Sequence, residues 1–147
     1  MSKVVVANDH GAVELTARIV GFLREKGYEV NYLGTAENKS VDYPDMAKAA
    51  CDEYNRGGYE FGIVCCGTGI GISICANKIR GIRCALPQNI FAATMAKEHN
   101  DANFLAFGGR IDYQDDVLDM VKAFIETKVS PEERHARRRE KMMALEK

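Results

Sequence analysis

The sequence predicts an α/β fold, a doubly wound, Rossmann-like, five-stranded parallel sheet with an extra C-terminal helix. Two observations indicate this class. Short apolar runs alternate with amphipathic stretches from the first residues onward, and each of five such runs is followed by a segment with helical spacing. Parallel strands need crossover helices, and five units are too few for a barrel of about eight. We therefore expect residues 1–147 to form one domain with strand order 2-1-3-4-5.

The first unit combines a strand at residues 3–7, KVVVA, with a helix at residues 13–26. Four apolar side chains of this helix recur at helical spacing, and a glycine that can terminate a helix follows them: Leu15, Ile19, Phe22, Leu23 and Gly27. The same pattern predicts four more strand and helix pairs, at residues 29–33 and 43–55, 60–65 and 70–79, 83–86 and 89–99, and 104–107 and 114–127.

The composition changes after Ser130 and Pro131 to EERHARRREKMMALEK, which is rich in good helix formers. Ser130 is a candidate N-cap with Pro131 at the first helical position, and two glutamates follow in the first turn. We expect a final helix that docks on the body or on another subunit, with a solvated charged tail as the alternative. Three residues suggest a packed face: Met142, Met143 and Leu145.

The bulk composition excludes several classes of protein. A formal net charge of −1 and a pI near 6.3 give no overall electrostatic reason to expect nucleic acid or an anionic membrane as a partner. There is no apolar run of about 20 residues and no secretory signal, so a cytoplasmic protein is expected. The five cysteines are odd in number and show no zinc spacing, which favours reduced thiols and no metal.

The motif CGTGIGIS, residues 66–73, lies where the third strand turns into a helix. In an open parallel sheet, ligands collect at the carboxyl ends of strands, where the first amides of a helix are free to bind an anion. Gly67, Gly69 and Gly71 let backbone donors approach a ligand, and Thr68 and Ser73 can add hydroxyl contacts. The alternative is a tight turn with no ligand.

This glycine motif differs from the two nucleotide-binding motifs. A dinucleotide site would show G-x-G-x-x-G, preferably after the first strand, with an acidic residue about 20 positions later. The spacing here is G-x-G-x-G, and the next strand is followed by PQN. A phosphate loop would need a lysine followed by serine or threonine, which GISI lacks. Neither a dinucleotide nor a nucleoside triphosphate is expected.

Two cysteines adjoin the motif. The thiolate is the reactive form of cysteine, and a helix N-terminus stabilises it, so Cys66 at the mouth of the loop is placed to react. Alternate side chains of a strand face opposite ways, so Cys65 is expected to point into the core or across the sheet. Either cysteine could instead be a small buried hydrophobe.

Polar residues also follow the first strand, where Asn8, Asp9 and His10 are expected at the carboxyl edge of the sheet. The alternative is that Asp9 is a helix N-cap and His10 is exposed. His99 and Asn100 come just before the fifth strand, which places them at the amino edge, the wrong end for the same pocket. A neighbouring subunit could present His99 across an interface, although a core or capping histidine is the simpler explanation.

The last helix carries four arginines. Arg134 and Arg138 are four residues apart and share a face, which suits two guanidinium groups that grip one phosphate. Arg137 and Arg139 point elsewhere. A solvated basic face is the alternative, and the chain lacks the basic stripes and stacking aromatics that nucleic-acid binding would require.

Through nearly its whole length the sequence resembles the type B ribose-5-phosphate isomerases, which are grouped with galactose-6-phosphate and allose-6-phosphate isomerases. The resemblance is carried by seven motifs: NDHGA, DYP at residues 42–44, CGTGIGIS, ANKIRGIR, EHNDAN, FGGR and RHARR. It implies an aldose-ketose isomerisation of a phosphosugar through a cis-enediolate, without metal or organic cofactor. It also implies a homodimer or a homotetramer built as a pair of dimers, with active sites that use both subunits.

The resemblance also implies roles for individual residues. Cys66 matches the base that moves a proton between C1 and C2, residues 67–73 match the hole that holds the enediolate oxygens, and His99, with Asn100 beside it, matches the residue that opens the furanose ring. The phosphate ligands would be His10, Arg134 and Arg138, joined by Arg110. Residues that orient sugar hydroxyls or assist proton transfer would be Asp9, Tyr43 and Thr68.

The segment LPQNIFAA, residues 86–93, departs from the short polar and acidic residues usual in that family, and GAVELT lacks a lysine often found in the first helix. These departures affect the sugar end of the pocket rather than the base. Ribose 5-phosphate is the expected substrate, with allose 6-phosphate, galactose 6-phosphate or a tetrose phosphate as alternatives. A different class, a non-catalytic anion-binding or redox-sensing domain that uses Cys66, is the remaining alternative.

Overall fold

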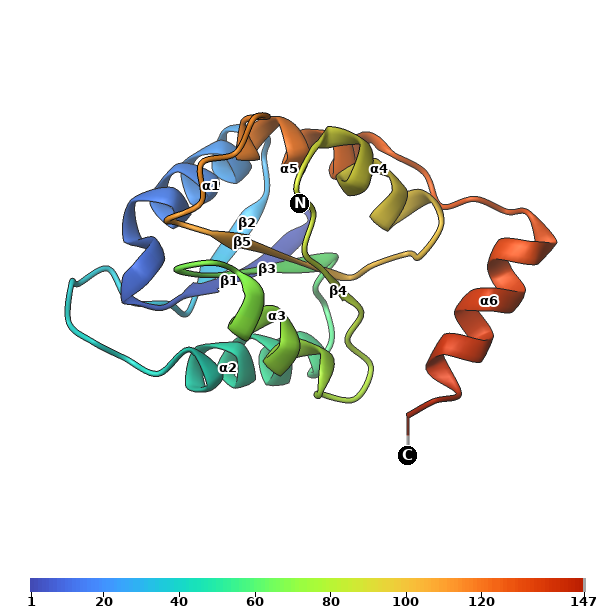
Figure 1. The fold of residues 1–147 in the computed structure, drawn as a ribbon, viewed down its shortest axis with the longest axis horizontal. Helices are drawn as coiled ribbons and strands as arrows, with labels where there is room; N and C mark the ends of the chain where they lie inside the picture. The colour runs from blue at the N-terminus through green and yellow to red at the C-terminus, as the bar shows by residue number, and fades with distance from the viewer. Residues whose placement is uncertain (147) are drawn as a thin grey trace.

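The computed structural model describes residues 1–146 and contains a five-stranded, all-parallel sheet with helices on both faces (Figure 1). One face is covered by α1 (Val13–Glu25), α4 (Ile90–Glu98) and α5 (Val117–Glu126), and the other by α2 (Tyr43–Asn55) and α3 (Ile70–Asn77). The sixth helix, α6 (Glu133–Met143), stands away from the sheet. The predicted α/β class with an extra C-terminal helix is confirmed.

The strands are β1 (Lys3–Asn8), β2 (Glu29–Tyr32), β3 (Phe61–Cys66), β4 (Cys84–Ala85) and β5 (Phe104–Gly108). Their order is β2-β1-β3-β5-β4, so the predicted order 2-1-3-4-5 is wrong for the last two strands. The reason is burial: every residue of β5 is buried, and this strand pairs with β3 in the centre, whereas β4 has two half-buried residues and forms the edge.

The sheet separates two apolar clusters because successive side chains of a strand face opposite ways. Val4, Val6 and Cys65 pack with α1, α4 and α5 in one cluster, whereas Val64 and Cys66 pack with α2 and α3 in the other. Cys65 is completely buried, which confirms the prediction that it points into the core. The two neighbouring cysteines therefore lie on opposite faces of the sheet.

Most predicted elements are present with small shifts at their ends, but the start of α6 differs. Its N-cap is Glu132, so the prediction of Ser130 as N-cap is wrong. The Ser130 amide instead donates to the carbonyl of Glu98 at the end of α4 (2.8 Å), and its Oγ accepts from the Glu132 amide (3.2 Å). Ser130 is thus part of a junction between α4 and α6.

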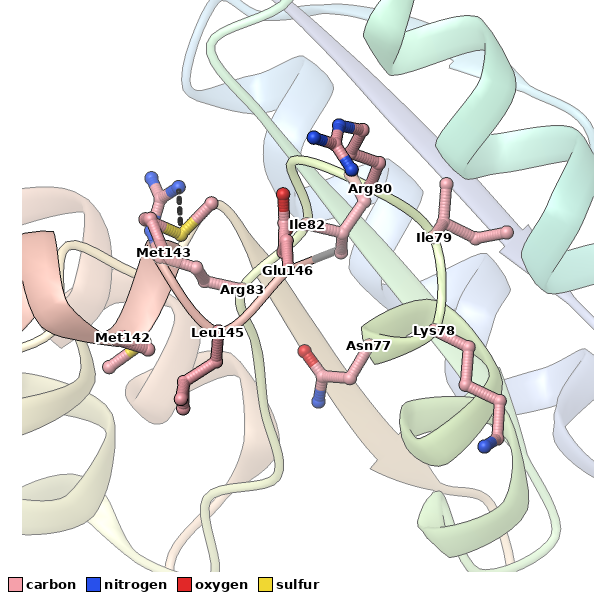
Figure 2. A pocket seen from close by; sticks show the side chains of 10 residues that line it. All are labelled: Asn77, Lys78, Ile79, Arg80, Ile82, Arg83, Met142, Met143, Leu145 and Glu146. Atoms are coloured by element: carbon pink, nitrogen blue, oxygen red, sulfur yellow. Dashed lines mark hydrogen bonds between the residues drawn. The ribbon is translucent and has the colours of Figure 1, made fainter.

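The helix α6 is attached to the body near its two ends. At the C-terminal end of α6 the Glu146 carboxylate accepts from the Gly81 amide (2.8 Å), and Arg83 Nη1 contacts Met143 Sδ (3.7 Å). A cavity of about 360 Å³ lies there between residues 77–83 and residues 142–146 (Figure 2). Met142 and Met143 are half-buried as expected, but Leu145 is 78% exposed, so the prediction of a packed Leu145 is wrong.

Candidate active site

The glycine motif forms the turn from β3 into α3, and Cys66 is the last residue of that strand. Gly69 has φ +80°, and a Cβ at this position would lie 2.9 Å from the carbonyl carbon of Phe107 and 2.7 Å from Leu86 Cδ1. Only glycine fits this turn. The turn directs the Gly69 amide at the thiol, with 3.2 Å between N and Cys66 Sγ, so a backbone donor holds the sulfur at the start of α3.

The segment that follows β5 is bound directly to this turn. The Gly109 amide donates to the Cys66 carbonyl and the Arg110 amide donates to the Gly67 carbonyl, both at 2.9 Å. The Arg110 guanidinium lies over Gly67, where an added Cβ would be 2.9 Å from Nη1. The predicted residue Arg110 is therefore brought to the glycine turn, with its side chain exposed to solvent.

The segment after β1 lies on another side of the same turn. The Asp9 amide donates to the Cys65 carbonyl (3.0 Å), and a Cβ at Gly11 would lie 2.9 Å from the Gly67 nitrogen. Asp9 is 5% exposed, and its Oδ1 accepts from the Gly11 amide (2.8 Å) as the N-cap of a short 3₁₀ turn, His10–Ala12. The capping alternative for Asp9 is thus correct, while His10 is half-buried rather than exposed.

A cleft of about 410 Å³ opens beside this segment. Its lining residues are Asp9, His10 and residues 40–45. His10 Nδ1 accepts from the Val41 amide (3.1 Å), which leaves its other ring nitrogen for a ligand. Tyr43 connects the cleft with the glycine motif, because a Cβ at Gly71 would lie 2.6 Å from Tyr43 Cε1.

Asp42 lines the same cleft and is a candidate site residue for which no role was predicted. The signal was available in the motif DYP, in which Asp42 directly precedes Tyr43 at the N-terminus of α2. A carboxylate at this position can accept hydrogen bonds from sugar hydroxyls. Asp42 therefore joins the candidate site.

The two hydroxyl groups of the motif are engaged locally. Thr68 Oγ1 accepts from the amide of Ile70, the first residue of α3 (3.2 Å), and Thr68 is exposed at the mouth of the turn. Ser73 is buried, and its Oγ donates to the Ile70 carbonyl (2.8 Å). Thr68 can thus meet a ligand, whereas the Ser73 hydroxyl hydrogen is used within its own helix.

The cysteines differ in their surroundings, although all five are free thiols. Burial raises the pKa of Cys65 to about 12 and that of Cys51 to about 12, and it also raises the pKa of Cys84. These thiols stay protonated at neutral pH and act as packing groups. Cys66 is 4% exposed in the single chain, at the end of β3 where the three loops meet.

Four predicted residues lie elsewhere in the chain. His99 is the C-cap of α4, directly before the segment that leads into β5, so it lies at the amino edge of the sheet as predicted. Asn100 follows it and is exposed. Arg134 and Arg138 are exposed on α6, which lies at the opposite end of the sheet from the turn between β3 and α3 (Figure 1). One chain therefore does not bring these four residues to Cys66.

The other two arginines of α6, Arg137 and Arg139, do not share the face of Arg134 and Arg138, as predicted. Arg137 pairs with Glu133 on the same helix, and Arg139 donates to the backbone carbonyls of His99 and Ser130. Arg134 forms an ion pair with Glu132 (2.7 Å), which holds its guanidinium at the start of the helix. Arg134 and Arg138 are both exposed and lie one turn apart on the helix.

Two further properties concern the described residues, 1–146. None of the helices within them has the length and apolarity that a membrane span requires. Nor do these residues contain three or more His, Cys, Asp or Glu side chains grouped so as to hold a metal ion.

Comparisons with known proteins identify similar sequences and structures. A family model described as Ribose/Galactose Isomerase matches residues 4–142. The ribose-5-phosphate isomerase B of Escherichia coli is 40% identical over 111 residues, 76% of this chain and 74% of that protein. A galactose-6-phosphate isomerase subunit of Clostridium acetobutylicum is 36% identical over 87% of this chain and 74% of its own length. The structure of Clostridium thermocellum ribose-5-phosphate isomerase B has TM-score 0.93 and 44% identity, covering 98% of this chain and 97% of that one.

Proposed function

Because the chain belongs to the ribose/galactose isomerase family, we propose that it interconverts ribose 5-phosphate and ribulose 5-phosphate, with Cys66 as the base. The relatives named ribose-5-phosphate isomerase B support the choice of a pentose phosphate, since they match by sequence and over nearly the full structure. The reaction is an internal redox change, in which C1 is reduced and C2 is oxidised, so no external oxidant or reductant is required.

The isomerisation requires a general base and hydrogen-bond donors that stabilise the negative charge developing on the enediolate oxygen. The base removes the proton from C2 of the open-chain aldose and returns a proton to C1, while O1 gains a proton and O2 loses one. The observation that carries the proposal is the backbone hydrogen bond from Gly69 to Cys66 Sγ (3.2 Å) at the N-terminus of α3. The same helix terminus offers backbone donors and a positive dipole end to the enediolate oxygens.

Phosphate binding and ring opening complete the proposed mechanism. His10 and Arg110 flank the glycine turn and would contact the phosphate together with Arg134 and Arg138.

His99 would protonate the ring oxygen as the C1–O4 bond of the furanose breaks and the C1 hydroxyl loses its proton. Asp9, Asp42, Tyr43, Thr68 and Asn100 would orient the sugar hydroxyls.

A second copy of the chain would supply His99, Asn100, Arg134 and Arg138, since in one chain they lie far from Cys66. Two features support such a homodimer, alone or within a homotetramer. The helix α6 projects from the body (Figure 1). Next to the glycine turn, α3 exposes Ile70 (52%) and Ile74 (53%) on one face, and Phe91 at the start of α4 is 72% exposed. Exposed apolar side chains that adjoin one another, as Ile70 and Ile74 do one turn apart on α3, are typical of interaction sites.

Proton exchange tests the proposal. With ribose 5-phosphate in deuterated water, the wild-type protein should form ribulose 5-phosphate and incorporate deuterium at the exchanging carbon. Cys66→Ala and Cys66→Ser should lose most of this activity, whereas Cys65→Ala, one residue away on the opposite face of the sheet, should keep it. A fully active Cys66→Ala protein would remove the proposed base. Ligand binding without any deuterium incorporation would favour the non-catalytic alternative.

A different phosphorylated aldose is the second candidate substrate. The relative named a galactose-6-phosphate isomerase subunit favours it, and so does Leu86, which begins the unusual segment LPQNIFAA and lies against Gly69. A panel of ribose 5-phosphate, allose 6-phosphate, galactose 6-phosphate and a tetrose phosphate separates the candidates. We expect the highest kcat/KM with ribose 5-phosphate, and a hexose phosphate preferred by tenfold or more would reverse the assignment.

A further inference from the structure

His99 does not stand alone at the end of α4, because its ring stacks on that of His135 in the first turn of α6. The ring centroids are 4.2 Å apart and the planes are inclined by 30°. His135 is 6% exposed and is the buried residue of α6, so the helix uses this side chain to contact the body. One face of the His99 imidazole is therefore covered by a fixed aromatic surface.

Hydrogen bonds hold both histidines in place. His135 Nδ1 is 2.8 Å from Ser130 Oγ, and the Ser130 amide donates to the Glu98 carbonyl (2.8 Å). Arg139 donates from one guanidinium to the His99 carbonyl (3.0 Å) and to the Ser130 carbonyl (3.1 Å). The end of α4, the connection to α6 and the first turn of α6 thus form one closed framework around the two rings.

The charges around His135 favour its neutral form. Burial is the main cause that lowers the pKa of His135, and His99, Arg134 and Arg138 lower it further, while Glu132 opposes them. The nearest carboxylate oxygen, Glu132 Oε2, is 3.7 Å from Nδ1. A neutral ring can support His99 in either of the protonation states that acid-base catalysis requires, because it does not repel the imidazolium form.

We propose that His135 is a positioning residue for ring opening, which fixes the orientation of the His99 imidazole by stacking on one of its faces. This rests on the proposed function, in which His99 transfers a proton to the ring oxygen of the furanose. A catalytic group must be held to within a fraction of an ångström of its reacting atom, since a misplacement of about 1 Å can cost on the order of a hundredfold in rate. The stacked ring supplies that restraint.

The two directions of the reaction separate positioning from a general structural role. Ribose 5-phosphate is a furanose that must open, whereas ribulose 5-phosphate carries its phosphate on O5, cannot close into a furanose and enters as an open chain. His135→Ala should therefore lower kcat with ribose 5-phosphate about tenfold. The kcat with ribulose 5-phosphate should stay within about twofold, because proton transfer at Cys66 is untouched and the open-chain aldose that forms can leave the site and close into the furanose in solution.

Matched variants complete the experiment. His135→Phe keeps a flat ring and should recover most of the ribose 5-phosphate activity, and His99→Asn should show the same directional loss more strongly. Arg137→Ala, on the same helix but outside the framework, should leave both directions unchanged. Retained activity with ribulose 5-phosphate itself reports that each variant is folded and assembled.

The outcomes distinguish this inference from the function on which it rests. Equal losses in both directions for His135→Ala, or no loss in either, would overturn the positioning role. A His99→Asn protein without a directional loss would overturn it as well. If the wild-type protein converts neither sugar phosphate, the proposed function is wrong.

Discussion

At the scale of single residues, position relative to the sheet decides what a side chain can do. Cys65 and Cys66 are adjacent and chemically identical, yet the pleat places Cys65 on the face of the sheet covered by α1, α4 and α5, and Cys66 on the other face, at the start of α3. Gly69 has a backbone conformation that other residues adopt only at a cost, and this conformation brings its amide to the sulfur. Reactivity at this site thus depends on one turn.

Gly69→Ala tests that dependence. An alanine at φ +80° costs roughly 1–2 kcal/mol, and its Cβ would also collide with the Phe107 carbonyl carbon. We expect a lower free energy of unfolding in urea and a loss of most isomerase activity. Gly21→Ala is the matched control, because nothing lies within 4 Å of the added Cβ in α1. It should raise stability by about 0.5–1 kcal/mol and leave activity unchanged. Equal stability of the two variants would contradict the assigned role of the turn.

Arg110→Ala tests the phosphate contact proposed beside Gly67. A hydrogen bond between charged groups contributes about 1.5–3 kcal/mol, which corresponds to a rise in KM of roughly 10- to 150-fold. Arg110→Lys should recover only part of the loss, since lysine lacks the bidentate geometry. Arg56→Ala, an exposed arginine that pairs with Glu53 at the end of α2, serves as the control in steady-state kinetics. An unchanged KM for Arg110→Ala would exclude Arg110 from the site.

At the scale of elements, burial decides the order of the strands, and the junction between α4 and α6 decides where the last helix lies. β5 takes a central place because its whole length is apolar, and β4 is displaced to the edge because only two of its residues pair. The end of α4 and the start of α6 are joined through Ser130, His135 and Arg139. This junction determines where His99 stands relative to the arginines of α6.

The junction should make stability depend on pH. The pKa of His135 is lowered in the folded protein, so at a pH below the unfolded value of about 6.5 the unfolded chain binds more protons. His135 therefore contributes full stability above pH of about 6.5, and this stability is lost as the pH falls. We expect Tm to decrease between about pH 6.5 and pH 5, and to decrease less in His135→Phe. Identical pH profiles of Tm for the two proteins would show that His135 does not titrate differently on folding.

At the scale of the whole molecule, the proposed site requires two chains. The glycine turn and the cleft lie at the carboxyl edge of the sheet, whereas His99 and α6 lie at the amino edge (Figure 1). The body next to the turn presents exposed isoleucines, and α6 presents exposed arginines. Two copies in symmetric contact can bring each α6 to the other's turn, because a twofold interface uses each surface twice.

Ile74→Glu tests the apolar surface of α3. A charge placed on a buried interface has a high desolvation cost, so the variant should elute as a monomer in size-exclusion chromatography and lose activity with it. Lys122→Glu introduces the same side chain at an exposed position of α5, on the other face of the sheet, and should change neither property. A monomer that keeps full activity would contradict a site shared between subunits.

Subunit mixing tests the sharing directly. Cys66→Ala and the double variant Arg134→Ala/Arg138→Ala should each be nearly inactive, but a mixed dimer would contain one site with Cys66 and both arginines intact. Random reassortment after dissociation should then restore about one quarter of the wild-type activity, since half the dimers are mixed and half of their sites are complete. If each site were built within one chain, no activity would return.

The sequence by itself determined the alternation of strands and helices, the glycine turn after β3, the separation of Cys65 from Cys66, and the place of His99 at the amino edge. These properties depend on neighbours a few residues apart and on the strict alternation of side chains along a strand. Only the tertiary structure decided that β5 lies between β3 and β4, that Ser130 joins α4 instead of capping α6, that Asp42 lines the cleft, and that His135 stacks on His99. Each of these depends on contacts between segments far apart in the chain, where burial and packing decide and local propensity does not.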